Sequence, residues 1–127
     1  MGESKAYIRN SDEKGSINIS EEVIAVITAA AAMEVEGVHS LFFSYGKEPA
    51  KALSKKALSR GIKLHIDGDN VIIDVYIIAS IGYCVNEVGA DVQGAVVSAV
   101  EATVGVTVNA VNVHVCGVSL KKNKSNT

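Results

Sequence analysis

Apolar residues recur along the chain at two spacings, one typical of helices and one typical of strands. Helical spacing follows Ser20, a favourable N-cap, and stops at Gly37; it returns at Val85 and stops at Gly105. Alternation of apolar and polar residues predicts strands over 15–19, 38–43, 62–66, 71–81 and 106–118. The chain therefore combines two long amphipathic helices with several strands.

These elements predict an α+β fold in the order β-α-β-(short α)-β-β-α-β. Two main helices on one face of a small mixed sheet would form a two-layer sandwich. The length of 127 residues fits one domain, which we place at 15–120. Residues 1–14 are polar and read as a flexible lead-in, and residues 121–127 read as a disordered basic tail.

The second helix carries one apolar stripe that should face the sheet. We expect this stripe to be buried against the last strand and the inward side of the 71–81 strand. The residues expected in this core are Val88, Val92, Val96 and Val100 with Val111, Val113 and Val115.

Residues 44–61 interrupt the pattern with a lysine-rich segment. Pro49 suits a first helical position and Gly61 suits a position past a helix end, so a short amphipathic helix is predicted. Its basic residues form either a solvated helix face or a docking surface for an acidic partner or anionic lipid. The residues of this basic surface are Lys51, Lys55, Lys56 and Arg60.

The side of the sheet away from the helices is the second candidate surface. Strand alternation separates Val71, Ile73, Val75 and Ile77 from a second set that mixes apolar and polar groups. Such a patch marks either an interface, homo-oligomeric in the simplest case, or a small second core under segment 44–61. The residues of this candidate interface are Ile72, Asp74, Tyr76, Ile78, His65, Asn112 and His114.

Composition and motifs argue against several functions. The net charge of −2 and pI near 5.9 disfavour nucleic acid as a partner. Glycine-rich phosphate loops and a GxSxG motif are absent, and the carboxylates are scattered, so we expect neither catalysis nor a cofactor. His39, His65, His114 and Cys116 could line up as metal ligands, but ordinary polar residues of the sheet are the favoured interpretation.

Localisation is predicted from the cysteines and the apolar stretches. Cys84 and Cys116 are isolated thiols, as expected of a cytoplasmic protein. The N-terminus lacks a secretory signal, and the apolar stretch 23–33 is too short to span a bilayer. Membrane contact should therefore be peripheral or made through a partner.

Four segments resemble one family. They are GSINISEEVIAVITAAAAMEVEGV, NVIIDVYIIASIG, VNEVGADVQGAVVSAVEATVG and VNAVNVHVCGV, and together they extend from about Gly15 to Val118. They look like the alkaline shock protein twenty-three / Gls twenty-four family of small cytoplasmic proteins from Gram-positive bacteria. The chain departs from the family pattern at Ile81, where an aromatic residue is usual, and at Thr103-Val104-Gly105, where Met-Thr-Gly is usual.

The resemblance implies a non-enzymatic interaction or scaffold protein of the envelope stress response. Members act near the membrane, tethered through an integral membrane partner. Another branch is associated with fatty-acid synthesis and acetyl-CoA carboxylase, so a regulator acting on carboxylase subunits is the alternative. The resemblance implies no catalytic residues.

Overall fold

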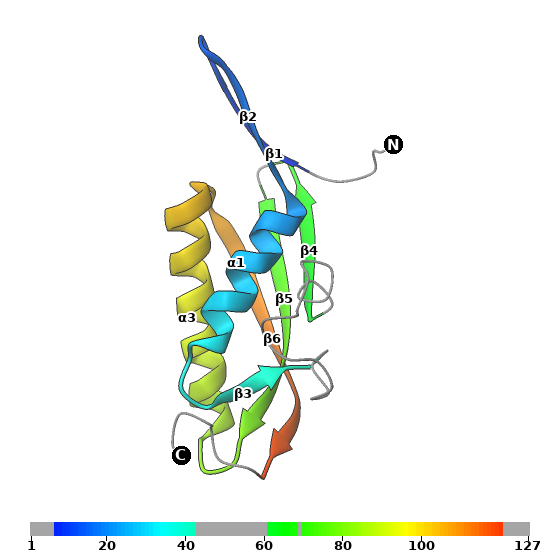
Figure 1. The fold of residues 1–127 in the computed structure, drawn as a ribbon, viewed down its shortest axis with the longest axis vertical. Helices are drawn as coiled ribbons and strands as arrows, with labels where there is room; N and C mark the ends of the chain where they lie inside the picture. The colour runs from blue at the N-terminus through cyan, green and yellow to red at the C-terminus, as the bar shows by residue number, and fades with distance from the viewer. Residues whose placement is uncertain (1–6, 43–60, 69, 121–127) are drawn as a thin grey trace.

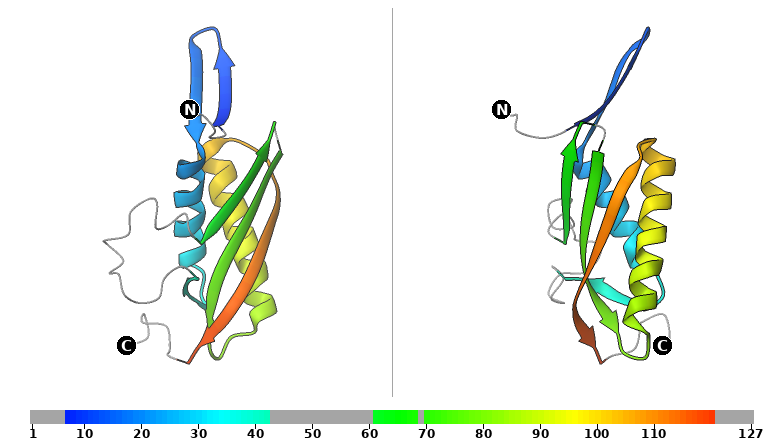
Figure 2. Two further views of the ribbon diagram at one scale, coloured as in Figure 1. Left: turned by 90° about the vertical axis from the view of Figure 1, so that its right-hand side faces the viewer. Right: turned by 180° about the vertical axis from the view of Figure 1, so that it is seen from behind.

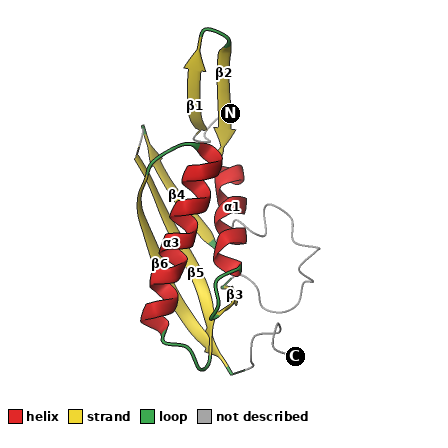
Figure 3. Cartoon of the chain, turned by 90° about the vertical axis from the view of Figure 1, so that its left-hand side faces the viewer, coloured by secondary structure: helices red, strands yellow, loops and turns green. Residues whose placement is uncertain are grey.

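The computed structural model describes residues 7–42, 61–68 and 70–120. Helices α1 (Glu21–Met33) and α3 (Val85–Val104) lie side by side on one face of a sheet (Figures 1 and 3). In the described residues this sheet has four strands: β3 (Val38–Leu41), β4 (Ile62–Asp67), β5 (Asn70–Ser80) and β6 (Val108–Ser119). The predicted α+β sandwich is confirmed, whereas the predicted short helix and its basic residues lie outside the described residues.

Strand β5 is the centre of the sheet and pairs with the three other strands. Its first half is antiparallel to β4 and its second half is antiparallel to β3, while β6 runs parallel along its other edge. The parallel pair needs a crossover connection, and α3 supplies it. The sheet is therefore mixed, as the sequence predicts.

Strands β3 and β4 meet β5 at one residue. The N–H of Phe42 donates to the carbonyl of Tyr76 over 2.8 Å, and the N–H of Tyr76 donates to the carbonyl of Gly61 over 3.0 Å. Phe42 and Gly61, which are far apart in the sequence, therefore lie opposite the same residue of β5.

The core lies between the helices and the inward face of the sheet. Helix α3 places a fully buried valine on every turn from Val88 to Val100, and α1 contributes Ile24 and several alanines. These side chains pack against Val71, Ile73, Val75, Ile77 and Val111. Burying β-branched side chains on both layers supplies the main stabilisation of the fold.

One predicted core residue is not in the core. Val113 packs against it, but Val115 is 38% exposed. Val115 pairs with Ile77 near the end of β5 that leads into α3, and Val85 in the first turn of α3 is itself 40% exposed. The helix layer is too open at that end to cover β6.

Residues 7–20 form a hairpin, although the sequence predicts a flexible lead-in over 1–14. Strand β1 (Tyr7–Asp12) pairs antiparallel with β2 (Gly15–Ser20), and the pair projects away from the two-layer body (Figure 1). The side chain of Asp12 accepts a hydrogen bond from the N–H of Lys14 over 2.8 Å, and Gly15 has φ +130°, so the turn is locally favoured. The predicted strand 15–19 thus belongs to this hairpin and not to the main sheet.

Gly37 connects α1 to β3 through a tight contact. Its φ of +100° favours glycine, and a Cβ atom there would meet Cγ2 of Val88 at 2.6 Å. Its carbonyl accepts a hydrogen bond of 2.8 Å from the N–H of Ser80. A residue without a side chain is therefore required where α1, α3 and β5 approach one another.

Candidate functional site

The face of the sheet turned away from the helices carries the candidate interface residues. Figure 2 (left) looks onto this face, with β4, β5 and β6 in front of the two helices. Alternation along β5 places Ile72, Asp74, Tyr76 and Ile78 here, and all four side chains are half-buried. His65 of β4 and Asn112 and His114 of β6 flank them in register.

Asp74 is the centre of a hydrogen-bonded network across three strands. Asn112 Nδ2 donates to Asp74 Oδ1 over 2.9 Å, and the Nε2 atoms of His114 and His65 lie 3.3 Å from Oδ1 and 3.1 Å from Oδ2. An ionised carboxylate only accepts hydrogen bonds, so both imidazoles must carry a proton on Nε2. The Asp74 side chain is 15% exposed, against 44% for His114 and 62% for His65.

The network lowers the pKa of Asp74. The hydrogen bond from Asn112 is the largest cause that holds the pKa of Asp74 below its ordinary value, and the contacts with His114 and His65 act in the same direction. Partial burial opposes this shift without overcoming it. Asp74 therefore keeps its negative charge to a lower pH than an ordinary aspartate does.

Tyr76 extends the network toward the middle of the sheet. Its ring stacks on the imidazole of His114, with centroids 4.4 Å apart and planes 11° from parallel. The Nζ atom of Lys63 lies 5.7 Å from the centroid of the same ring. A cation, two rings and a carboxylate are thus held in one continuous row.

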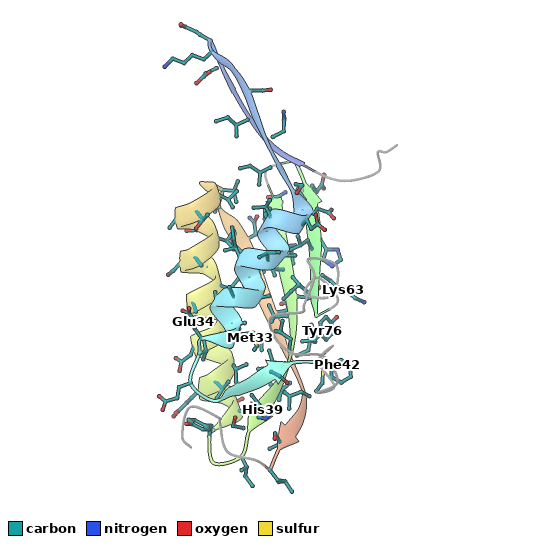
Figure 4. The ribbon with its side chains drawn as sticks, viewed as in Figure 1. Met33, Glu34, His39, Phe42, Lys63 and Tyr76 are labelled. Carbon is teal, nitrogen blue, oxygen red and sulfur yellow. The ribbon has the colours of Figure 1, made fainter. Side chains whose placement is uncertain are left out.

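Apolar side chains border this row. Ile78 packs closely against β6, because a Cβ atom on Gly117 would lie 3.3 Å from Ile78 Cδ1. Phe42, which follows the buried Leu41, is 38% exposed. Lys63, Tyr76 and Phe42 follow one another on the side of the sheet away from the helices (Figure 4).

The structure brings the seven candidate interface residues together on one face, as the alternation predicts. Their role as an interface stays a prediction, and the basic surface lies outside the part of the chain that is described. The sequence reasoning missed Lys63 and Phe42 as members of this face. The signal for Lys63 was present, since it alternates with His65 and lies in register with Asp74.

Histidines and cysteines do not converge on a metal site. Among the described residues, no group of three or more His, Cys, Asp or Glu side chains is arranged to hold a metal ion. His65 and His114 both contact Asp74, whereas His39 lies on β3 and Cys116 directs its Sγ toward the carbonyl of His114 at 3.7 Å.

Comparison with known families identifies the chain at the level of its family. Residues 9–120 match the alkaline shock protein twenty-three family, described as having a cell envelope-related function. The chain belongs to this family. The match begins inside β1, so the family domain includes most of this strand, which the sequence reasoning placed in a lead-in.

Relatives of the alkaline shock protein twenty-three family member described here occur in Gram-positive bacteria. The uncharacterized protein Spy1535 of Streptococcus pyogenes is 38% identical over 85% of this chain and 82% of its own length. The uncharacterized Bacillus subtilis proteins YloU and YqhY are 36% and 29% identical, each over 82% of this chain and over 88% and 77% of their own lengths. No solved structure gives a significant match.

Neither α1 nor α3, the helices in the described ranges, combines the length and the apolar character that a membrane-spanning helix needs.

Proposed function

We propose that this protein is a non-enzymatic scaffold of the envelope stress response, which binds a protein partner through the open face of its sheet. The observation that supports the proposal is the row of side chains centred on Asp74, which are held by one another beside exposed apolar groups. The family's cell envelope-related function gives the setting.

The composition of the face suits protein recognition. Tyrosine is enriched in interfaces because a large rigid ring adds contact area at little cost in conformational entropy. Tyr76 is already fixed between His114 and Lys63, so less ordering remains for a partner to impose. Ile72 and Ile78 supply apolar area on either side.

The same geometry argues against acid–base catalysis at this face. A general base works best with a pKa near the operating pH, which for a carboxyl group requires a raised pKa. The pKa of Asp74 is lowered, and its oxygens already accept hydrogen bonds from Asn112 and the histidines. A carboxylate held in this way positions its neighbours and is poorly suited to abstracting protons.

We propose an integral membrane protein as the partner, with acetyl-CoA carboxylase subunits as the alternative. The basic residues Lys51, Lys55, Lys56 and Arg60 would add weak contacts with anionic lipid or acidic protein, worth about 1 kcal/mol each near an anionic membrane. Charge reversal at Lys51 and Lys55 should then lower the recovery of the protein with envelope fractions at low salt. Unchanged recovery would assign these residues to a solvated surface.

The test of the sheet face is affinity capture of partners by the tagged chain in its own host, with quantitative mass spectrometry. The double variant Tyr76→Lys/Ile78→Glu should lose the principal partner, while Ala90→Lys on the exposed side of α3 should keep it. A membrane protein among the lost partners supports the scaffold, and carboxylase subunits support the alternative. Equal partner recovery by the folded double variant would overturn the proposal.

Sedimentation of the purified chain tests whether the partner is a second copy. Self-association through this face predicts an oligomeric parent and a monomeric Tyr76→Lys/Ile78→Glu variant. A monomeric parent in which Tyr76 is shielded by segment 44–61 would instead identify this face as a second small core.

A further inference from the structure

A groove runs between the two helices, on the side of the molecule opposite the Asp74 network. Its volume is about 630 Å³. Helix α1 and the residues just after it line one wall with Ile27, Ala30 and Glu34, and α3 lines the other with Ala95, Ser98 and Ala99. Ala30, Glu34 and Ser98 are exposed, so the groove opens at the surface of the helix layer.

Small side chains create the groove. Residues 29–32 of α1 are all alanine, and α3 faces them with Ala95 and Ala99. These short side chains leave space between the two helices on the side away from the sheet. Ile27 is half-buried and supplies apolar surface in the wall. Val23, four residues earlier and 45% exposed, lies on the same side of α1 and prolongs the apolar line.

The two helices that line the groove carry charge of one sign. Helices α1 and α3 contain no Lys or Arg, and neither has a basic residue in its last turn. Their acidic residues, with those that follow α1, are Glu21, Glu22, Glu34, Glu36, Glu87, Asp91 and Glu101.

One of these carboxylates lines the groove, and a second lies next to it along α3. Glu34 lines it, and Asp91 lies one helical turn before Ala95 on the same side of α3. The C-terminal end of α1 adds negative partial charge beside Glu34. By contrast, Glu101 accepts a hydrogen bond from the N–H of Val108 over 2.9 Å and Glu36 accepts one from the Tyr83 hydroxyl over 3.4 Å.

We propose that this groove binds a basic amphipathic helix of a partner protein. The apolar side of that helix would lie along Val23, Ile27 and Ala30, and its Lys or Arg residues would reach Glu34 and Asp91. Residues 23–34 extend over roughly 17 Å, which accommodates about three turns of such a helix. An anionic lipid surface is disfavoured because it would meet carboxylates of its own sign.

This inference goes beyond the sheet-face scaffold, because it assigns a second surface on the opposite layer. The Asp74 network joins β4, β5 and β6 on the side of the sheet away from the helices, whereas the groove is lined by α1 and α3. Two partners could therefore be bound at once without competing for the same residues.

The probe is a fluorescein-labelled synthetic peptide of leucine and lysine, fourteen residues long, in an amphipathic order. Fluorescence anisotropy measures its Kd for the full chain. The peptide controls are the same composition in a shuffled order and the amphipathic order with glutamate in place of lysine. The wild-type protein should bind the amphipathic lysine peptide at least about tenfold more tightly than either control.

Variants locate the binding surface. Ala30→Trp fills the groove and Glu34→Lys/Asp91→Lys reverses its charge; each should weaken binding at least about tenfold, and the second loss should shrink at high salt. Glu13→Lys/Asp67→Lys changes the net charge equally, on exposed residues away from the groove, and should leave the Kd within about twofold. The sheet variant Tyr76→Lys/Ile78→Glu should also keep binding, which separates this proposal from the sheet-face function.

The outcomes decide the matter in either direction. Wild-type affinity in folded Ala30→Trp, equal losses in the two charge-reversal pairs, or equal binding of the shuffled peptide would each overturn the proposal. Thermal unfolding of every variant confirms that lost binding is not lost folding.

Discussion

The two faces of β5 show how one strand serves stability on one side and recognition on the other. Val71, Ile73, Val75, Ile77 and Ala79 are all 0% exposed beneath the helices. Their neighbours Ile72, Asp74, Tyr76 and Ile78 point the other way and remain half-buried. The first set is defined by volume and close packing, and the second by a few polar pairs with defined partners.

This difference predicts different costs for substitution on the two faces. A buried valine loses transfer free energy and packing together when it is replaced, whereas a surface hydrogen bond contributes about 1 kcal/mol net. Substitutions on the covered face should therefore destabilise the protein more than substitutions on the open face. Residues of the open face can then be selected for binding at little cost in stability.

The largest effect is expected on the covered side. Val96→Asp places an unpaired charge at a fully buried position of α3. The free energy of unfolding should fall by roughly several kcal/mol, and the cooperative thermal transition should disappear. Ala90→Asp, on the exposed side of the same helix, is the matched control and should melt near the parent temperature. A normal transition in Val96→Asp would refute this packing.

A smaller but clear loss is expected at Gly37. Gly37→Ala must accept both φ +100° and a contact of 2.6 Å with Val88, so the free energy of unfolding should fall by about 3 kcal/mol. Gly68→Ala shares a positive φ, +63°, but has open space around the added Cβ, and should lose only about 1 kcal/mol. Urea denaturation measures both, and equal losses would mean that the contact with Val88 relaxes at no cost.

On the open face, Asp74→Asn should lower stability by about 1 kcal/mol at neutral pH. The pKa of Asp74 in the folded state is below its ordinary 3.8, so its contribution is complete above that value and is lost as pH falls through the folded-state pKa. Between neutral pH and pH about 3 the parent should therefore lose more stability than Asp74→Asn. Parallel pH profiles of the two proteins would contradict the network.

The smallest effects separate the two histidines. His65→Ala removes one contact of a side chain that is 62% exposed, and should change stability by less than about 0.5 kcal/mol. His114→Ala also removes the stack on Tyr76 and should cost about 1 kcal/mol. Thermal melts of both variants, with Asn112→Ala alongside, rank the contributions; a larger loss for His65→Ala would reverse the assigned roles.

Much of the fold could be predicted because the apolar residues of this chain recur at clear helical and strand spacings. Valines four residues apart defined the buried side of α3, and strict alternation in β5 assigned each of its residues to the correct face. The hairpin was missed because Tyr7–Asp12 is mostly polar, so its pairing with β2 gives no apolar alternation to recognise.

The sequence predicted which residues share the candidate site but not the hydrogen bonds between them. Alternation brought His65, Asp74 and His114 to one face, yet the hydrogen bonds to each oxygen of Asp74 depend on the relative register of β4, β5 and β6. Val115 failed as a core residue because alternation along β6 does not report how far the helix layer extends over that strand. The groove depends on the distance between two helices, which no pattern along one chain contains.

The junction at Tyr76 has a consequence for the continuity of the sheet. Phe42 supplies an N–H to Tyr76 and Gly61 supplies a carbonyl, so together they make the two hydrogen bonds that a single residue makes in an unbroken antiparallel strand. Strands β3 and β4 thus act as one interrupted edge strand beside β5, although they are separate in the sequence. Because the cost of closing a loop rises only slowly with its length, a change in the number of residues between Phe42 and Gly61 should leave this edge of the sheet in place.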